Sequence, residues 1–326
     1  MNKKETHNIL ILSVGRRVEL VQLFKKAAKE LEIESLVCAA DCSHTAPALY
    51  YADKKYIVSK INSGKYIEDI IAICQKSNIK LVIPTIDTEL SILAENKKEI
   101  ESKTNAIVHI SDSEVIEICN DKVKTNVYLE KHGFYVPKIY DKEDLKNNNI
   151  IFPLFIKPKH GSASKGAHPV YTKEELDAWL FLTDEPIVQD FLEGDEYTVD
   201  CFLDFNSNII SIVPRLRLET RDGEISKGII TKDTLIISEI KKLLNILKPI
   251  GQITIQVMKI TKGIGFIEIN PRFGGGAPMS IMAGANSCIN LFKILIGDTK
   301  AYKSDYDQKM FLRFDQTIML DSDSND

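Results

Sequence analysis

Residues 266–276 read FIEINPRFGGG, which joins a strand pattern to three polar side chains and a glycine run. Glu268, Asn270 and Arg272 stand at every second position, so an extended chain places all three side chains on one face. A carboxylate beside an amide oxygen suits Mg²⁺, which prefers oxygen ligands and keeps water or phosphate as the others. A guanidinium just beyond them can hold an anion through two hydrogen bonds. A structural ion pair would explain Glu268 and Arg272, but not Asn270 or the glycines.

The segments before this stretch predict the sheet to which it belongs. Two runs are typical of strands: residues 252–260, which contain Gln256, and residues 263–270. The short turn between them favours antiparallel pairing. From residue 152 onward strands dominate. The remaining strand runs are 152–158, 167–171, 186–192, 196–204 and 208–219, and helical patterns cover 121–132 and 234–247, the latter starting after Asp233.

The first 115 residues alternate strand and helix instead. Strand runs at 9–14, 36–40, 55–58, 81–84 and 106–110 alternate with helical patterns over 17–31, 66–75 and 88–100, the last with Asp87 as a candidate N-cap. This alternation predicts a parallel sheet with helices on both faces. Ligands of such sheets bind beyond the carboxyl ends of the strands. The loops 15–19, 41–45 and 85–89 are therefore candidates for an acceptor site, with Arg16, Arg17 and Asp87 either as substrate contacts or as solvated loop charges.

Residues 152–166, FPLFIKPKHGSASKG, combine a strand ending at Lys157 with a loop rich in glycine and serine. Such a loop lets backbone N–H groups approach phosphate oxygens closely, because its side chains are small. The segment is not a P-loop, since Ala167 follows Gly166. The alternative is an ordinary lysine-bearing hairpin between strands. The candidate phosphate contacts are Lys157, Gly161, Ser162, Ser164 and Gly166.

Residues 186–196, PIVQDFLEGDE, open from an apolar strand into a polar stretch. The backbone at Phe191 and Leu192 can hydrogen-bond the edge of a purine, and Glu196 can accept hydrogen bonds from ribose hydroxyls. The alternative is a strand, a turn and a solvated acid, and this segment alone favours that alternative.

Composition excludes several classes. The chain has 326 residues, 44% of them hydrophobic and 27% charged, with a net charge of -4, which is typical of a globular protein. We expect no nucleic-acid partner, because no basic stripe with interleaved aromatic residues is present. We expect no membrane association, since no run of about 20 apolar residues occurs. Six scattered cysteines without a CxxC pair favour reduced thiols and a cytoplasmic location.

Taken together, the segments resemble the ATP-grasp superfamily, and most closely its single-module proteins that are similar to half of the carbamoyl-phosphate synthase large subunit. NDKVKTNVYLEKHGFYVP resembles the first helix of the nucleotide domain, FIKPKHGSASKG the phosphate-covering loop, VQDFLEGDE the adenine hinge, and IQVM with FIEINPRFGGG the metal-binding strands. The matches follow the family's order. They depart from it at Gln189 and Asp190, where an acidic pair is commoner.

The resemblance implies an α/β and α+β fold: a Rossmann-like pre-ATP-grasp domain followed by an ATP-grasp fold of two antiparallel-sheet subdomains. The implied domains are 1–115, 116–190 (small subdomain), 191–320 (large subdomain) and a disordered tail at 321–326. The implied nucleotide contacts are Lys122, Lys157, Gly161, Ser162, Ser164, Gly166, Gln189, Asp190, Phe191, Leu192, Glu196 and Lys227, with Arg215 or Arg217 beside Lys227. The implied metal residues are Gln256, Glu268 and Asn270, and the implied catalytic residues are Arg272 and Lys227.

The function that follows is an ATP-dependent carboxylate–amine or carboxylate–thiol ligase working through an acyl phosphate. It would use ATP and Mg²⁺, with Mn²⁺ as a second candidate metal, and small-molecule carboxylate and amine substrates; a homodimer is one candidate assembly. One alternative is phosphorylation of a carboxyl or carbamate group as in carbamoyl-phosphate synthesis, and another is a non-catalytic ATP-binding regulator. An NAD-dependent oxidoreductase is disfavoured, because the loop after the first strand, SVGRR, has one glycine instead of GxGxxG.

Overall fold

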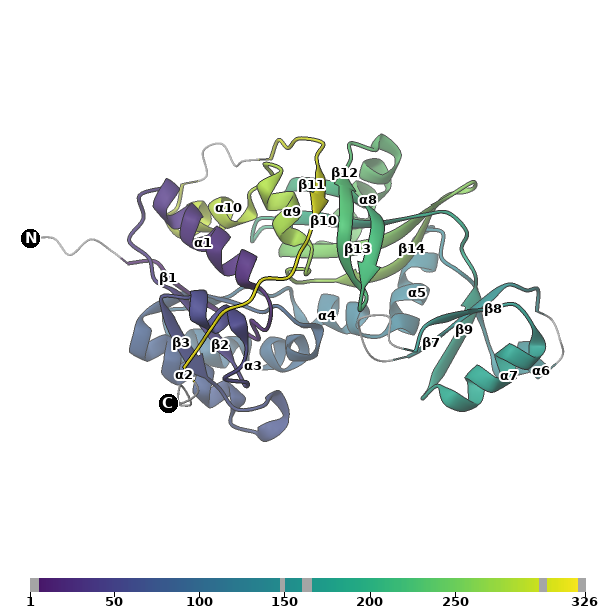
Figure 1. The fold of residues 1–326 in the computed structure, drawn as a ribbon, viewed down its shortest axis with the longest axis horizontal. Helices are drawn as coiled ribbons and strands as arrows, with labels where there is room; N and C mark the ends of the chain where they lie inside the picture. Colours follow the sequence, from purple (N-terminus) through teal and green to yellow (C-terminus); the bar gives the residue numbers. More distant parts are fainter. Residues whose placement is uncertain (1–5, 147–149, 160–165, 299–303, 322–326) are drawn as a thin grey trace, which may run out of the picture.

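The computed structural model describes residues 6–146, 150–159, 166–298 and 304–321. Figure 1 shows a lobe built on a parallel sheet beside a lobe built on a large antiparallel sheet, with a small sheet at the far end of the molecule. In the part of the chain so described, no helix is both long and apolar enough to cross a membrane.

The first lobe contains a parallel sheet of order β3-β2-β1-β4-β5. Its strands are β1 (Asn8–Ile11), β2 (Val37–Asp41), β3 (Lys54–Ile57), β4 (Ile79–Ile83) and β5 (Ile107–Val108). The inner strands β1, β2 and β4 are almost wholly buried, as expected where helices cover both faces. The strand order reverses between β1 and β4, which places a crevice at the carboxyl ends of these two strands.

Helices from both ends of the chain cover this sheet. One face packs against α1 (Val18–Glu30), and α1 in turn packs against α9 (Ala277–Met282) and α10 (Ser287–Leu295) near the other end of the chain (Figure 1). The opposite face packs against α2 (Tyr66–Ser77) and α3 (Leu90–Lys103). Phe273, which follows the candidate metal residues Glu268 and Asn270, is buried in the same core as Phe24 of α1. The site segment is therefore anchored to both lobes.

The second lobe contains a six-stranded antiparallel sheet of order β14-β13-β10-β11-β12-β15. Its strands are β10 (Asp195–Leu203), β11 (Ile209–Arg221), β12 (Glu224–Ile230), β13 (Gly251–Ile260), β14 (Gly263–Asn270) and β15 (Met310–Leu312). One face is apolar and packs against α4 (Ser113–Asn120), α5 (Lys122–Lys131) and α8 (Thr234–Leu247). The alternate residues form a polar face.

The small sheet has the order β6-β9-β7-β8 and is also antiparallel. It consists of β6 (Ile139–Tyr140), β7 (Leu154–Pro158), β8 (His168–Val170) and β9 (Pro186–Asp190), with α6 (Lys142–Lys146) and α7 (Lys173–Leu182). Its separate core includes Leu154, Val170 and Leu176. Because β9 leads directly into β10, one short connection joins this sheet to the large one.

The predicted fold class is confirmed: a parallel-sheet domain precedes two antiparallel sheets. The predicted hairpin is β13 and β14, in which Gln256 lies opposite Glu268. The predicted N-cap at Asp87 is wrong. Residues Asp87–Glu89 form a 3-10 turn, α3 begins at Leu90, and the Asp87 carboxylate binds Arg272 instead. The helix α4 and the strand β12 were not predicted.

Candidate active site

A cavity of about 300 Å³ lies where the crevice of the parallel sheet meets the polar face of the large sheet. Residues after β1 and β4 form one wall, and β10–β14 together with the glycine loop form the other. The lining residues are Arg17, Thr85, Ile86, Asp87, Thr88, Thr198, Arg215, Arg217, Gly223, Glu224, Ile225, Thr254, Gln256, Glu268, Asn270, Arg272, Gly274, Gly275 and Gly276.

The candidate metal residues share the polar face, as the alternation predicts. Gln256 of β13 lies opposite Glu268 of β14, and Thr254 lies opposite Asn270 one step along. The intervening residues Ile255 and Ile269 are fully buried in the core on the other side of the sheet. Register thus places one carboxylate and two amide groups together at the cavity wall.

Glu196, the candidate ribose acid, contacts this group directly. The Gln256 side-chain amide donates a hydrogen bond to the Glu196 carboxylate. Arg217 lies 3.3 Å from the same carboxylate and donates to the carbonyl oxygen of Gly223 at 2.9 Å. Burial lowers the pKa of Arg217, and the carboxylate of Glu196 partly offsets that effect. Glu196 and Gln256, which the sequence assigned to different ligands, are therefore neighbours.

Two candidate phosphate-binding lysines stand near Glu268. Lys157 on β7 is buried, which lowers its pKa to about 8, while the Glu268 carboxylate acts in the opposite direction. Burial also lowers the pKa of Lys122, again opposed by Glu268, and the Lys122 ammonium donates to the carbonyl oxygen of Pro158 at 3.1 Å. The end of β7 is thus joined to α5, and both lysines lie within electrostatic reach of Glu268.

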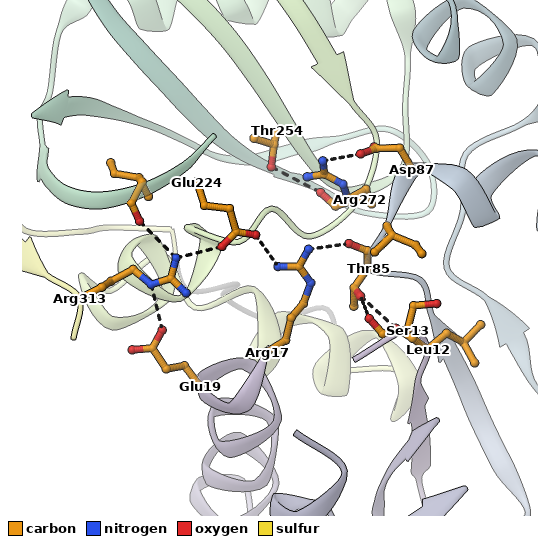
Figure 2. Close-up of polar contacts among 12 residues, drawn as sticks. Leu12, Ser13, Arg17, Glu19, Thr85, Asp87, Glu224, Thr254, Arg272 and Arg313 are labelled. Atoms are coloured by element: carbon orange, nitrogen blue, oxygen red, sulfur yellow. Dashed lines mark hydrogen bonds and ion pairs between the residues drawn. The ribbon is translucent and has the colours of Figure 1, made fainter. Parts of the chain in front are cut away.

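Two separate sets of ion pairs join the lobes at the cavity (Figure 2). Arg272 lies 2.6 Å from Asp87, so a cation of the second lobe meets an anion of the first. At Arg17 the cation belongs to the first lobe and the anion to the second, since Arg17 lies 3.7 Å from Glu224 on β12. Arg17 also donates to the carbonyl oxygen of Thr85 at 2.9 Å. Burial and the nearby Arg272 lower the pKa of Arg17 to about 10.

Glu224 also belongs to a second contact between the lobes. Arg313, just after β15, lies 3.1 Å from Glu224 and 3.9 Å from Glu19 on α1. Figure 2 shows Glu224 between the guanidinium groups of Arg17 and Arg313. Two cations therefore hold Glu224 at the cavity edge.

The glycine run makes room for cavity side chains. A Cβ at Gly274 would lie 2.8 Å from the Thr254 hydroxyl, one at Gly275 would lie 2.5 Å from the Glu224 carboxylate, and one at Gly276 would lie 2.5 Å from the Arg215 guanidinium. Arg215 is fully buried with Asp200, whose carboxylate accepts from Arg215 at 3.1 Å and from Ser280 at 2.6 Å. Each glycine therefore has a steric reason that the sequence alone does not show.

The structure places other predicted residues outside the cavity lining. Lys227 is half-exposed on β12 and lies 2.6 Å from Glu219. Asp190 accepts a hydrogen bond from the Tyr140 hydroxyl at 2.7 Å, and Arg16 lies 3.2 Å from Asp315 in a neighbouring depression. The hinge side chains Gln189, Phe191 and Leu192 lie near the junction of β9 and β10. Gly166 has a positive φ of 70°, and Gly161, Ser162 and Ser164 lie outside the described residues.

Sequence reasoning missed a buried carboxylate behind the cavity wall. Glu89 is fully buried and accepts hydrogen bonds from the hydroxyls of Ser13 and Tyr66, each at 2.6 Å, and from the backbone N–H groups of Thr85 and Ile86 at 2.8 and 3.2 Å. It fixes the loop that presents the Thr85 carbonyl oxygen and Asp87. The one sequence feature that pointed to Glu89 was its position in the loop 85–89, which follows a predicted strand. Glu224, Thr198 and Asp200 were also missed.

Two family models match the chain. Residues 9–109 match "PylC-like, N-terminal domain", and residues 183–314 match "ATP-grasp in the biosynthetic pathway with Ter operon". The N5-carboxyaminoimidazole synthetase of Staphylococcus aureus, solved with ADP, superposes with a TM-score of 0.71 over 95% of this chain and 81% of that one, at 16% identity. This chain is an ATP-grasp protein.

Curated relatives of this ATP-grasp protein span several activities. It is 26% identical to the carbamoyl-phosphate synthase of Methanobrevibacter smithii over 64% of this chain and 56% of that protein. It is 25% identical to the formate-dependent phosphoribosylglycinamide formyltransferase of Prochlorococcus marinus strain NATL2A, over 81% of this chain and 70% of that protein. The alignment with the synthase thus spans little more than half of that relative's length.

Proposed function

We propose that this ATP-grasp protein is a ligase that activates a carboxylate as an acyl phosphate and passes the acyl group to an amine. One observation carries the proposal: the face bearing Gln256, Glu268 and Asn270 lines the same cavity as Arg17 and Arg272, and its Glu268 carboxylate is near Lys122 and Lys157. Such a site can hold a polyphosphate at one end and a carboxylate at the other.

Support for a nucleotide comes from the two lysines and the hinge. Lys157 is buried beside another cation, Lys122, and the Glu268 carboxylate offsets only part of the cost of burying its charge. A bound triphosphate supplies further negative charge. The Staphylococcus aureus protein that shares this fold was solved in complex with ADP, which agrees with a nucleotide as the ligand here. We assign the adenine to the backbone at Phe191 and Leu192 and the ribose to Glu196.

The donor set at the metal-binding stretch fits Mg²⁺. Among the described residues, no group of three or more His, Cys, Asp or Glu side chains could hold a metal. Glu268 and Asn270 supply one carboxylate and one amide oxygen, with Gln256 beside them, and Mg²⁺ is commonly held by one or two carboxylates together with substrate phosphates. When bound, Mg²⁺ would neutralise charge on the phosphates; Mn²⁺ is an alternative with the same preference for oxygen.

The proposed reaction uses the protein's own groups as follows. Arg272 holds the substrate carboxylate, one oxygen of which attacks the γ-phosphorus of ATP while the bond to the bridging oxygen of ADP breaks. Lys122 and Lys157 stabilise negative charge on the transferred phosphoryl group and on the departing ADP. The amine nitrogen then attacks the acyl carbon, the bond to phosphate breaks, and the amine loses a proton to solvent. Arg272 and Lys227 are the proposed catalytic groups, although Lys227 would have to leave Glu219.

The test measures ADP and phosphate release with Mg·ATP, or Mn·ATP, against pools of carboxylates, amino acids and bicarbonate, each with and without amines. We expect release that depends on one carboxylate and is accelerated by one amine. Glu268→Gln should lower the rate at least about a hundredfold, because it removes the charged metal ligand. Glu239→Gln on α8, a matched change on the opposite face of the large sheet, should leave the rate unchanged. ATP binding without release in any pool would contradict the proposal.

A further inference from the structure

The acceptor end of the cavity has ion pairs that each join the two lobes. Arg272 pairs with Asp87 at 2.6 Å, and Arg17 lies 3.7 Å from Glu224. The two carboxylates differ in their surroundings. Glu224 also contacts Arg313 at 3.1 Å and keeps a cation if Arg17 turns to a ligand. For Asp87, in contrast, Arg272 is the one ion-pair partner within the described part of the chain.

A substrate carboxylate that binds Arg272 competes with Asp87 for the guanidinium. The side chains are only 13% and 24% exposed, so a separated Asp87 would be a largely desolvated charge without a partner. One oxygen of Asp87 and the Nε of Arg272 already lack hydrogen-bond partners. The Asp87 carboxylate raises the pKa of Lys122, but the Lys122 ammonium donates to the carbonyl oxygens of Pro158 and Lys159. The carboxylate of a simple acid would therefore satisfy Arg272 and leave Asp87 unpaired.

We propose that the carboxylate substrate is an amino acid, held with its carboxylate on Arg272 and its cationic amino group on Asp87. This inference rests on the proposed ligase function and names the substrate class of the same site. In an α-amino acid the two charged groups are attached to one carbon, so the molecule can insert between two side chains that now touch. Arg272 then pairs with the carboxylate of the amino acid in place of Asp87, and Asp87 pairs with its ammonium group in place of Arg272. Neither buried charge is left without a partner.

The same charges argue against two other substrate classes. A dicarboxylate would bring a second anion next to Asp87 and Glu224, which line the same cavity. A carboxylate with an apolar remainder would leave Asp87 unpaired. The prediction is specific, because it concerns the amino group and not the side chain of the substrate.

The experiment compares matched ligands in three forms of the full chain. ADP release with Mg·ATP is measured for each L- and D-amino acid and for its deaminated counterpart, such as alanine with propionate and phenylalanine with 3-phenylpropionate. The forms are wild type, Asp87→Asn and the control Asp177→Asn, which changes an ion-paired aspartate on α7 outside the cavity lining. Binding of the same ligands to the protein with Mg·ADP is measured by calorimetry, and thermal unfolding checks that each variant is folded.

In wild type we expect kcat/KM for the substrate amino acid to exceed that of its deaminated counterpart at least about tenfold, which corresponds to about 1.4 kcal/mol. Asp87→Asn should bring this ratio close to one by weakening the amino acid alone, and Asp177→Asn should leave it unchanged. If Asp87→Asn weakens both ligands equally, Asp87 only orients Arg272 and the inference is wrong. Failure of every amino acid to bind would also overturn it.

The outcomes also separate this inference from the proposed function. Amino acids that bind in an Asp87-dependent way without ADP release from any carboxylate would support the ammonium site and overturn the ligase. ADP release that depends on a deaminated acid or on bicarbonate, and on no amino acid, would support the ligase and overturn the ammonium site.

Discussion

Replacing Asp200 by asparagine tests whether the floor of the cavity is held by a buried ion pair. Asp200 and Arg215 have side chains that are each 1% exposed, and the Asp200 carboxylate lies 3.1 Å from the Arg215 guanidinium. The same carboxylate accepts hydrogen bonds from Ser280 at 2.6 Å and from Thr254 at 3.3 Å. Asparagine preserves the shape and one acceptor oxygen but removes the charge that balances Arg215.

The expected cost follows from the burial of both partners. Removing one partner of a buried pair leaves an uncompensated charge and destabilises a protein by about 3–5 kcal/mol. The Arg215 guanidinium packs closely against Gly276, where a Cβ would lie 2.5 Å from it. Two further nitrogen atoms of Arg215 already lack partners. We therefore expect Asp200→Asn to lower the free energy of unfolding by about 3 kcal/mol or more.

The assay is urea unfolding at pH 7, followed by far-ultraviolet circular dichroism and fluorescence. Arg215→Met in the Asp200→Asn background should recover at least half of the loss, since it removes the unpaired charge. Asp305→Asn, which breaks an exposed pair with Lys232, should cause no measurable change. A loss below about 1 kcal/mol for Asp200→Asn, or additive effects of the two cavity changes, would refute the reasoning.

Two further predictions concern buried bases whose pKa values are lowered. Burial brings the pKa of Lys157 to about 8, so its positive charge is lost as pH rises through that value. We expect Mg·ATP affinity to fall above pH 8, approaching tenfold per pH unit, with proton uptake on binding in calorimetry; Lys157→Arg should remove both effects, and their persistence would contradict the assignment. Burial lowers the pKa of His109 to about 3, so below its ordinary pKa of 6.5 the unfolded chain binds a proton that the native chain does not. Stability should therefore fall by about 2 kcal/mol between pH 7 and pH 5, measured by urea unfolding, and His109→Gln should lose this dependence; an equal loss in the variant would exclude His109 as its source.

Much of the fold could be predicted from local patterns. The buried strands of the first lobe are short apolar runs, and burial on both faces is what a parallel sheet requires. Alternation at 266–270 predicted that Glu268 and Asn270 share a face, and the short turn at Lys262 predicted the partner strand. These features depend on neighbours in sequence or on a single hairpin.

The remaining parts of the site depend on contacts between distant segments. Asp87 reads as a helix cap, but the helix starts later and its carboxylate meets Arg272, 185 positions along the chain. The sequence offered no specific reason for the glycines at 274–276, whereas their neighbours Thr254, Glu224 and Arg215 show that these glycines leave space for cavity side chains. Neither relation has a local signature.

The inner wall of the first lobe illustrates the same limit. Glu89 falls where the predicted loop 85–89 meets the predicted helix 88–100, and nothing in that setting indicates that four donors from three segments surround its carboxylate. Its partner Ser13 lies 76 positions away, so only the assembled sheet brings them together. The sequence therefore does not predict that an acid is buried at the point where the strand order reverses.

The most direct test of the central claim follows an oxygen atom. The substrate carboxylate identified in the release assay is labelled with ¹⁸O, and the phosphate and nucleotide products are analysed by mass spectrometry. An acyl-phosphate ligase transfers one labelled oxygen to inorganic phosphate and produces ADP without label. Unlabelled phosphate would show that water, and not the carboxylate, accepts the phosphoryl group, and label in AMP would show an acyl adenylate; either result contradicts the account.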